Sequence, residues 1–546
     1  MTVGKDTWGG HAPSQERKDV PPPPHWRMEA VAATERPHHL RASPDGHTLA
    51  FILDRADLGS DVWLMDAGGS TPRQLTVDRP PAAYWEDTPP AWSPDGQLIA
   101  YTSDGWVRVV DAGGGPSRRL VEGWSPRWGG ERTLVVGYDA PREITSTLLP
   151  TVTEVSRLAL VDVDDPWLRP VTAADSDAAD PDVSGDRMAC TVYPPDDRNR
   201  SDVVVVDLET GEVTVVAGAP QMHATGACWS PDGRRLAWVS EEPGWYTVHI
   251  GDGAGGGRPV SGGDGDFSEL SWSADGSRLA AVRTYRGRCD LVVIDAESGS
   301  VDVLATGGVW SDPAWLADGT LAAVYEDHAT PARIEAVALD GTRRPVFEPA
   351  PAAITSAPHV APVDVVFHGR DGLEIHGFLF RPAADEGPVP AVVYPHGGPT
   401  SLYADEWDGY AQYFLDRGYA WFAINFRGST SYGRDFERAN HGVWGVDDTQ
   451  DCLAAADYLR TLDWVDGDRL AIFGASYGSY LALVSLTDDP SHRFACGVAK
   501  YGDCDILTSW AQGDRPGVED LERMMGHPSR SRAAYRAGSP IHRLDQ

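Results

Sequence analysis

A recurring pattern of turns and apolar strands fills the first two thirds of the chain. The tetrapeptide Ser-Pro-Asp-Gly marks it, and an apolar strand pattern follows each copy. Proline presets φ at the first central position of a turn, and glycine accepts the left-handed conformation. Each copy therefore predicts a turn between two strands. The copies and their close variants lie at 43–46, 93–96, 230–233, 273–276 and 316–319.

A second strand follows each first strand and is usually closed by Asp or Gly. The seven closing positions are 66, 111, 162, 207, 251, 295 and 340, which are 45, 51, 45, 44, 44 and 45 residues apart. A single blade cannot bury both faces of its sheet, so seven copies near 45 residues predict a seven-bladed β-propeller. An array of β-sandwiches would show no single period. A tryptophan at or just before a turn suits packing between blades. Trp92, Trp229, Trp272 and Trp315 accompany four of these turns, and Trp128 precedes Gly-Gly-Glu in the third repeat, which lacks the tetrapeptide and is placed by spacing.

The pattern changes near residue 350, where a Pro/Ala-rich connector at 349–362 precedes strands that alternate with helices. Near-continuous apolar strands between helices predict a largely parallel, buried sheet of the α/β-hydrolase type. The predicted strands are 363–367, 375–381, 391–395, 420–425, 470–473 and 495–499, and the predicted helices are 403–417, 449–461 and 480–486. The expected domains are a flexible N-terminal arm (1–28), the propeller (29–350), a linker (351–362) and an α/β-hydrolase domain (363–546) that lacks its last strands.

The most specific chemical signal is Gly-Ala-Ser-Tyr-Gly at 474–478, between an apolar strand pattern and a helical one. Such a strand–turn–helix forces the serine backbone into strain and exposes its hydroxyl above the sheet. The sequence therefore predicts Ser476 as a nucleophile.

A second motif, His-Gly-Gly-Pro at 396–399, directly follows a predicted strand. This is where the hydrolase fold presents a backbone N–H to a developing oxyanion. The expected donors are the N–H groups of Gly398 and Tyr477, each contributing about 3–4 kcal/mol to lowering the barrier. The alternative is that the glycines and proline only make a turn.

Arg427 lies in a glycine-containing loop at 425–433 that follows the next predicted strand. Its side chain is a candidate for binding a substrate carboxylate or carbonyl. The alternative, favoured because arginine near several carboxylates is usually paired, is a salt bridge to Asp447, Asp448 or Asp451.

Together, the propeller pattern and these motifs resemble the prolyl oligopeptidase family of serine peptidases, most closely its acylaminoacyl-peptidase and dipeptidyl-peptidase-like branches. The shared motifs are His-Gly-Gly-Pro, Asn-Phe-Arg-Gly-Ser, Trp444-Gly445 and Gly-Ala-Ser-Tyr-Gly-Ser-Tyr, and Ser479 stands where the family more often has glycine. The resemblance implies a hydrolase domain capped by the propeller, which cleaves short peptides through an acyl-enzyme on Ser476, with Gly398 and Tyr477 as oxyanion donors.

A serine nucleophile also needs a base, and in this fold the order is Ser, then Asp or Glu, then His. The resemblance places the acid roughly 80 residues after the serine, whereas 70 residues follow Ser476 here. That order argues against Asp545 as the acid and against His492, His527 and His542 as the base. The triad Asp and His are therefore expected beyond residue 546, and the chain is expected to be C-terminally incomplete.

Composition narrows the range of partners. The formal charge is −35, which would repel a nucleic-acid backbone. No stretch has the ~18 apolar residues of a membrane span, no secretory signal begins the chain, and no metal-binding cluster or cofactor motif occurs. Six scattered cysteines without a Cys-x-x-Cys motif are typical of a reducing, cytoplasmic compartment.

These observations predict a cytoplasmic serine peptidase acting on short peptides, without a cofactor, a metal, a nucleic-acid partner or a membrane. The sequence is compatible with a homo-oligomer and does not decide the oligomeric state. The alternatives are an esterase of the same fold and a non-catalytic propeller binding protein with a vestigial hydrolase domain. The pair Glu241-Glu242 resembles the paired glutamates that hold a substrate amino terminus in dipeptidyl peptidases, but it precedes Pro-Gly and favours a hairpin turn.

Overall fold

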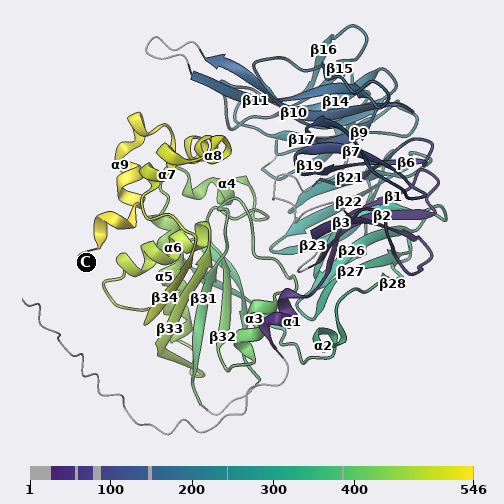
Figure 1. Cartoon of the computed structure of the whole chain (residues 1–546). Helices are drawn as coiled ribbons and strands as arrows, with labels where there is room; N and C mark the ends of the chain where they lie inside the picture. Colours follow the sequence, from purple (N-terminus) through teal and green to yellow (C-terminus); the bar gives the residue numbers. More distant parts are fainter. Residues whose placement is uncertain are drawn as a thin grey trace, which may run out of the picture.

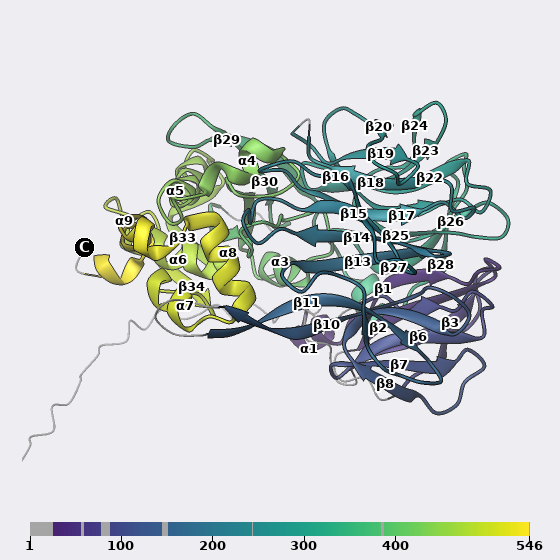
Figure 2. The ribbon, with the colours of Figure 1, turned by 90° about the horizontal axis from the view of Figure 1, so that it is seen from above.

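The computed structural model describes residues 26–544, except 56–58, 78–87, 145–150, 243 and 384–386. Two β-rich domains face one another (Figures 1 and 2). Strands β1–β28 form the N-terminal domain, and strands β29–β34 with most of the helices form the C-terminal domain. Predicted site residues therefore fall on the C-terminal domain, with the propeller opposite.

The N-terminal domain is a β-propeller. Five of its sheets have four antiparallel strands in chain order, and β21–β28 form one eight-stranded sheet in which Cys289 and Val309 make a parallel pair. The predicted propeller is confirmed with five separate blades, while the count of seven stays a prediction. The strands are β1 (Arg36–Ala42), β2 (Thr48–Arg55), β3 (Gly59–Asp66), β4 (Arg73–Gln74), β5 (Ala91–Trp92), β6 (Leu98–Ser103), β7 (Trp106–Asp111), β8 (Arg118–Glu122), β9 (Trp124–Trp128), β10 (Thr133–Ile144), β11 (Thr151–Asp162), β12 (Arg169–Pro170), β13 (Asp177–Ser184), β14 (Arg187–Tyr193), β15 (Asp202–Asp207), β16 (Val213–Ala217), β17 (Ala224–Trp229), β18 (Leu236–Ser240), β19 (Thr247–Gly251), β20 (Arg258–Pro259), β21 (Asp266–Trp272), β22 (Arg278–Tyr285), β23 (Arg288–Asp295), β24 (Val301–Ala305), β25 (Val309–Trp315), β26 (Leu321–Asp327), β27 (Thr330–Val337) and β28 (Arg343–Phe347).

The last propeller strands close the ring on the first. Asp312 of β25 accepts a hydrogen bond from the backbone N–H of His39 in β1 at 2.7 Å and lies 3.2 Å from Nη1 of Arg41. Apolar side chains from both ends of the domain fill the seam, including Phe51 and Ile334. These contacts hold the last propeller strands against the first.

The turn tryptophans pack between blades, as their position in the repeat predicts. Three indole N–H groups donate to a carbonyl of the preceding sheet, Trp92 to Arg41, Trp128 to Ala91 and Trp272 to Cys228, and that of Trp315 in β25 donates to Ser271 in β21. The same side chain thus fills apolar space and satisfies a backbone group of its neighbour.

The C-terminal sheet has the order β29-β30-β32-β31-β33-β34, with parallel pairing from β32 through β34 and an antiparallel edge at β29 and β30. Its strands match the six predicted ones. They are β29 (Pro362–His368), β30 (Glu374–Phe380), β31 (Val389–Pro395), β32 (Ala420–Asn425), β33 (Val465–Ala475) and β34 (Cys496–Lys500). The α/β-hydrolase arrangement predicted from strand spacing is therefore present.

The helices flank this sheet and extend beyond it. They are α1 (Met28–Ala32), α2 (Ala352–Thr355), α3 (Gly409–Leu415), α4 (Arg434–Glu437), η2 (Arg438–Asn440), α5 (Asp447–Arg460), α6 (Tyr477–Thr487), α7 (Ile506–Gln512), α8 (Arg515–Met525), α9 (Pro528–Gly538) and η3 (Pro540–Arg543). The predicted helix at 403–417 begins only at Gly409, because the Asp408 carboxylate caps it by accepting from the N–H groups of Tyr410 and Ala411.

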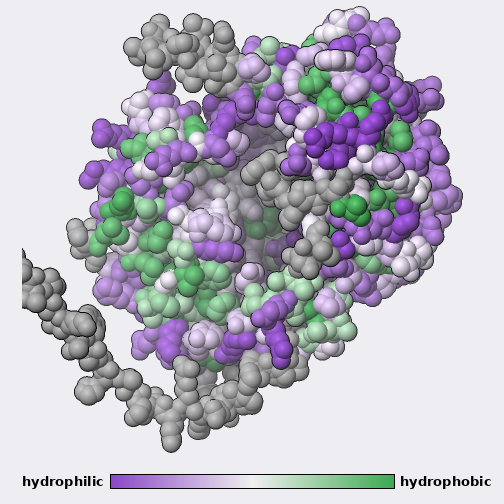
Figure 3. Space-filling model, in the orientation of Figure 1, coloured by the Kyte–Doolittle hydropathy of each residue, from purple (hydrophilic) through white to green (hydrophobic). Residues whose placement is uncertain are grey.

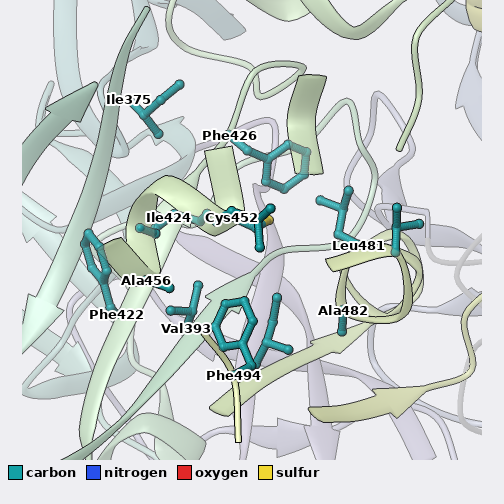
Figure 4. Packing of buried hydrophobic residues seen from close by; sticks show 14 of the residues in the cluster. Ile375, Val393, Phe422, Ile424, Phe426, Cys452, Ala456, Leu481, Ala482 and Phe494 are labelled. Carbon is teal, nitrogen blue, oxygen red and sulfur yellow. The ribbon is translucent and has the colours of Figure 1, made fainter. Parts of the chain in front are cut away.

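The hydrolase core lies between this sheet and helices α5 and α6 (Figure 4). Side chains from strands β29–β33 and both helices meet there, among them Val393, Phe422, Ile424, Cys452 and Leu481. Burying one such Phe or Leu side chain contributes roughly 1.5–3 kcal/mol. This packing fixes the carboxyl ends of β31, β32 and β33, which is where the predicted site residues lie.

The end of the predicted N-terminal arm is part of the fold. Residues 1–25 lie outside the described residues, but Trp26 is 1% exposed, and its indole N–H donates to the carbonyl of Pro358 at 3.2 Å. Trp26 packs with Ile354 of α2, which lies in the predicted linker. The last residues of the predicted arm are therefore docked on the linker.

The face seen in Figure 3 carries hydrophilic residues over much of both domains, with hydrophobic patches on each of them. Across the described ranges, no helix is both long and apolar enough to cross a membrane.

Candidate active site

Ser476 lies at the turn between β33 and α6. Its backbone has φ 52° and ψ −124°, a left-handed conformation that is uncommon for a residue with a side chain. The serine is exposed, and its N–H donates to the carbonyl of Lys500 on β34 at 3.1 Å. The strand, strained turn and helix predicted from the sequence are all present.

The glycines on either side of Ser476 are required by close packing. A Cβ on Gly478 would lie 2.1 Å from the carbonyl oxygen of Pro395, and one on Gly474 would lie 2.2 Å from the backbone of Gly478. Any side chain at these positions would push α6 away from β31 and β33. The turn is therefore held tightly against the strand that leads to His396.

The loop after β31 brings two glycines beside the serine. A Cβ on Gly397 would lie 3.4 Å from Ser476 Cβ and 4.0 Å from its Oγ. Gly398 is exposed and has φ 126°, a conformation that favours glycine. Tyr477 is the first residue of α6, a position whose N–H has no partner within a helix. Its N–H also lies at the positive end of the helix dipole.

A cavity of about 710 Å³ opens beside these three residues. Ser476, Tyr477 and Gly398 line one side, and helices α7 and α8 supply the opposite wall through residues such as Ile506 and Leu521. The volume suits a small organic ligand or a short peptide segment. The sequence analysis did not predict α7 and α8, although Val518, Leu521 and Met525 recur at helical spacing within α8.

The side chain of Tyr477 points away from the cavity into the core. Its hydroxyl donates a short hydrogen bond to Asp448 of α5, and its ring lies edge-on to Trp444 with 4.8 Å between ring centroids. Asp448 is fully buried, and burial raises the pKa of its carboxyl to about 7. Sequence reasoning listed Asp448 only as a partner for Arg427, so this support behind the serine turn was missed.

His396 is close to the serine but is engaged elsewhere. Its Nε2 lies 2.7 Å from the Ser429 hydroxyl, its Nδ1 lies 2.6 Å from the carbonyl oxygen of Gly397, and the ring stacks on Phe426. Burial lowers the pKa of His396 to about 4, so the ring is neutral. This histidine therefore fixes the glycine loop and is not directed at the serine.

Arg427 is buried in an ion-pair cluster. It donates two hydrogen bonds to the Asp451 carboxylate, both at 2.8 Å, and two to the Asp371 carboxylate, both at 2.9 Å. Asp447 is 3.9 Å away, whereas Asp448 pairs with Tyr477 instead. Arg427 is absent from the described lining of the serine cavity, so its contacts match the salt-bridge alternative rather than the substrate-binding one.

In the described part of the chain, no hydrogen bond joins a histidine to Ser476. His527 pairs with the Ser529 hydroxyl at 2.8 Å, while His492 and His542 are exposed. Asp545 lies outside the described residues. The expectation that the triad Asp and His follow residue 546 stays a prediction.

Glu241 is buried at the domain interface rather than exposed to a ligand. Its carboxylate accepts from Arg438 Nη2 at 2.6 Å and from the N–H of His223 at 2.9 Å. The segment lies between β18 and β19, as expected for a connection between two blade strands. Glu241, the first of the two adjacent glutamates, is thus already paired with Arg438 of the other domain.

Comparison with known proteins agrees with this site. Residues 406–546, which include the serine turn, match the model of the prolyl oligopeptidase family. The match covers about a quarter of the chain and lies within the C-terminal domain. A similar curated protein is dipeptidyl aminopeptidase BIII of Pseudoxanthomonas mexicana, 34% identical over 224 residues, or 38% of this chain and 32% of that protein. Acylamino-acid-releasing enzyme of Sus scrofa is 31% identical over 129 residues, or 23% of this chain and 18% of that protein.

Solved structures share the fold over nearly the whole chain. A puromycin hydrolase has a TM-score of 0.83 at 22% identity and covers 96% of this chain and 87% of its own. The acylaminoacyl peptidase of Pyrococcus horikoshii has a TM-score of 0.74 at 20% identity and covers 94% and 85%. The chain matches only a third or less of the length of these two curated relatives. Their activities are therefore not assigned to this protein by the match.

Proposed function

We propose that this protein is a serine peptidase that hydrolyses short peptides through an acyl-enzyme on Ser476. The observation that carries the proposal is the left-handed, exposed Ser476 at a strand–helix turn, facing the loop of Gly397 and Gly398. The match of residues 406–546 to the model of the prolyl oligopeptidase family supports it. The peptide-cleaving relatives supply the substrate class only by analogy.

In the proposed reaction, Ser476 Oγ attacks the carbonyl carbon of the scissile amide and gives its proton to a base. The carbonyl oxygen becomes an oxyanion, which accepts hydrogen bonds from the N–H groups of Gly398 and Tyr477. The C–N bond then breaks, the amine leaves with a proton, and an ester to Ser476 remains. Water hydrolyses that ester by the same steps. The base and its acid are predicted after residue 546.

Substrate binding by Arg427 is not part of this proposal, because four hydrogen bonds direct its guanidinium to Asp371 and Asp451. We assign it instead to holding the loop after β32 against α5. That loop carries Ser429, which binds His396 and thereby the glycine loop.

A fluorophosphonate probe tests the proposal on the protein isolated from its own cells. An activated serine displaces fluoride from phosphorus and keeps the probe as a stable ester, so we expect one label on the tryptic peptide that contains Ser476. Ser476→Ala should abolish labelling, and Ser491→Ala, an exposed serine on another loop, should leave it unchanged. A label elsewhere, or none, would overturn the peptidase assignment.

Substrate comparison separates the alternatives. A peptidase releases the amine from a peptide anilide, whereas an esterase of the same fold cleaves the matching aryl ester and leaves the anilide intact. A binding protein with a vestigial hydrolase domain would bind the peptide without labelling or cleavage.

We also infer that the propeller has seven blades. The eight-stranded sheet divides into β21–β24 and β25–β28, each antiparallel in chain order. A buried cluster of the kind that separates the other blades lies between these halves and includes Leu291, Val293, Trp310 and Ala323. With seven blades, we also propose the domain bounds predicted from the sequence: an arm at 1–28, the propeller at 29–350, a linker at 351–362 and the hydrolase domain at 363–546. A crystal structure in which β23 and β25 part along their length would support it, and a continuous β23–β25 ladder would contradict it.

Cellular location and assembly complete the proposal. All six cysteines are free, including the exposed Cys496 and Cys504, which supports a reducing, cytoplasmic compartment. Homo-oligomerisation is left open.

A further inference from the structure

A second cavity, of about 510 Å³, lies at the domain interface on the other side of the glycine loop. Gly397, whose Cβ position faces Ser476, forms part of its wall. The remaining wall comes from α1, from blade strands β26 and β27, and from the segment that leads into α3. The proposed function does not use this cavity.

Its lining combines carboxylates with aromatic rings. The charged residues are Glu35, Arg36, Glu326, Glu406 and Asp408, and the aromatic ones are Tyr394, His396, Tyr403, Trp407 and Tyr410. Four carboxylates against one guanidinium make the cavity anionic, since His396 is neutral. A carboxylate next to aromatic faces is the environment that binds an organic ammonium group.

Most of these charges already have partners. Glu326 is 5% exposed and accepts from Arg36 Nη2 at 2.6 Å. Asp408 accepts from the N–H of Tyr410 at 2.8 Å and from the Tyr403 hydroxyl at 2.8 Å, so both of its oxygens are bound. These pairs shape the wall but leave little capacity for a ligand.

Glu406 is different. It lines the cavity, it is half-buried, and no hydrogen bond or ion pair joins its carboxyl to any residue that the structure describes. Burial and the neighbouring charge of Glu326 raise the pKa of this carboxyl to about 7, with Arg36 opposing the shift. A carboxylate kept without a donor costs stability, and a bound cation would remove that cost.

We infer that this cavity binds the primary ammonium group of a ligand through Glu406, beside the loop that faces Ser476. The inference deepens the proposed function and rests on it, because a peptide entering the serine site carries such a group at its amino end. A lysine side chain supplies the same chemistry, and the test distinguishes the two sources.

Equilibrium binding by calorimetry tests the site without relying on turnover. The ligands are Gly-Phe-amide, its N-acetyl derivative and N-acetyl-Lys-Phe-amide, measured at pH 8 with the full-length protein carrying Ser476→Ala, so that they bind without being cleaved. We expect Gly-Phe-amide to bind at least tenfold more tightly than its acetylated form. Glu406→Gln should remove that difference, and the matched control Glu209→Gln, on an exposed propeller turn, should preserve it.

Tight, Glu406-dependent binding of the acetylated lysine peptide would support the ammonium site and assign a side chain as its source. A preference for the free amine that survives in Glu406→Gln would overturn the assignment, as would equal binding of all three ligands. Should Glu406→Gln fail to fold, Glu406→Asp serves instead, since it retracts the carboxylate and should weaken the preference in part.

The two proposals fail separately in these experiments. Fluorophosphonate labelling of Ser476 without any preference for the free amine would leave the peptidase assignment standing and remove the ammonium site. A Glu406-dependent preference for the free amine without labelling of Ser476 would support the ammonium site and overturn the peptidase assignment.

Discussion

Arg515 at the start of α8 reaches across the domain interface to Asp177 of β13, with 2.9 Å between Nη1 and Oδ1. The same guanidinium donates to the carbonyl of Glu154 at 2.9 Å and to the Ser156 hydroxyl at 3.0 Å. Figure 2 shows the hairpin of β10 and β11 extending from the propeller toward α7 and α8. One wall of the serine cavity is thus held in place by the other domain.

Arg515→Ala should therefore loosen that wall. Hydrogen bonds to a charged group contribute roughly 1.5–3 kcal/mol, so local opening of α8 should become about tenfold more frequent or more. Amide hydrogen exchange of residues 515–525 measures this directly and should speed up. Arg536→Ala, an exposed arginine of α9, should leave exchange in α8 unchanged. Equal exchange in wild type and Arg515→Ala would show that α8 is held by its own domain.

Gly478→Ala should destabilise the protein without touching any ligand. The added Cβ would lie 2.1 Å from the carbonyl oxygen of Pro395, so α6 or β31 must move. We expect a loss of about 1–3 kcal/mol in the free energy of unfolding, measured by urea titration. Gly262→Ala is the control, because nothing lies within 4 Å of its Cβ position. An unchanged urea midpoint for Gly478→Ala would contradict the close packing of the turn.

Sequence patterns were sufficient for the propeller, for the six strands of the C-terminal sheet and for the serine turn, because turn chemistry and strand periodicity are local. The second strand of every repeat was located, and so were the strands and turns on which Ser476 and Gly398 lie. Contacts between distant segments leave no such pattern. The Tyr477–Asp448 pair joins residues of two helices, and Glu406 meets Glu326 across 80 residues of chain, so neither could be predicted.

The partners of the charged residues Arg427 and Glu241 were likewise hard to predict, because they lie on distant segments. Arg427 was rightly expected to have carboxylate partners, but Asp371, which follows another strand, was not among those considered. Glu241 was expected on a turn between two blade strands and lies there, whereas its interdomain partner Arg438 could not be foreseen. Helices α7–α9 were also missed, although the apolar residues of α8 recur at helical spacing.

Asp448 should make stability depend on pH. Its carboxyl has a pKa of about 7 in the folded protein and near 4 when unfolded, because burial penalises the charge. The folded state therefore holds an extra proton between these values, and the free energy of unfolding should fall as pH rises from 4 to 7. Asp448→Asn removes this contribution while leaving an acceptor for the Tyr477 hydroxyl.

Urea titrations at pH 5 and pH 8 measure the effect as a difference between two proteins. The carboxyls of Glu269 and Glu437 titrate in the same range, so wild type alone would not isolate Asp448. We expect wild type to lose more stability than Asp448→Asn between the two pH values. Parallel losses in both proteins would mean that Asp448 is ionised throughout, held by its hydrogen bonds.

The Arg427 cluster gives the sharpest test of a structural against a ligand-binding role. Asp451 is 0% exposed, so Arg427→Ala leaves a buried carboxylate without its counter-charge. Breaking a buried pair in this way typically costs about 3–5 kcal/mol. The double variant Arg427→Ala/Asp451→Asn removes the stranded charge and should recover part of that loss in urea titrations. Recovery identifies the buried charge as the cause. If Arg427→Ala were as stable as wild type and only bound peptides more weakly, Arg427 would have a substrate-binding role instead.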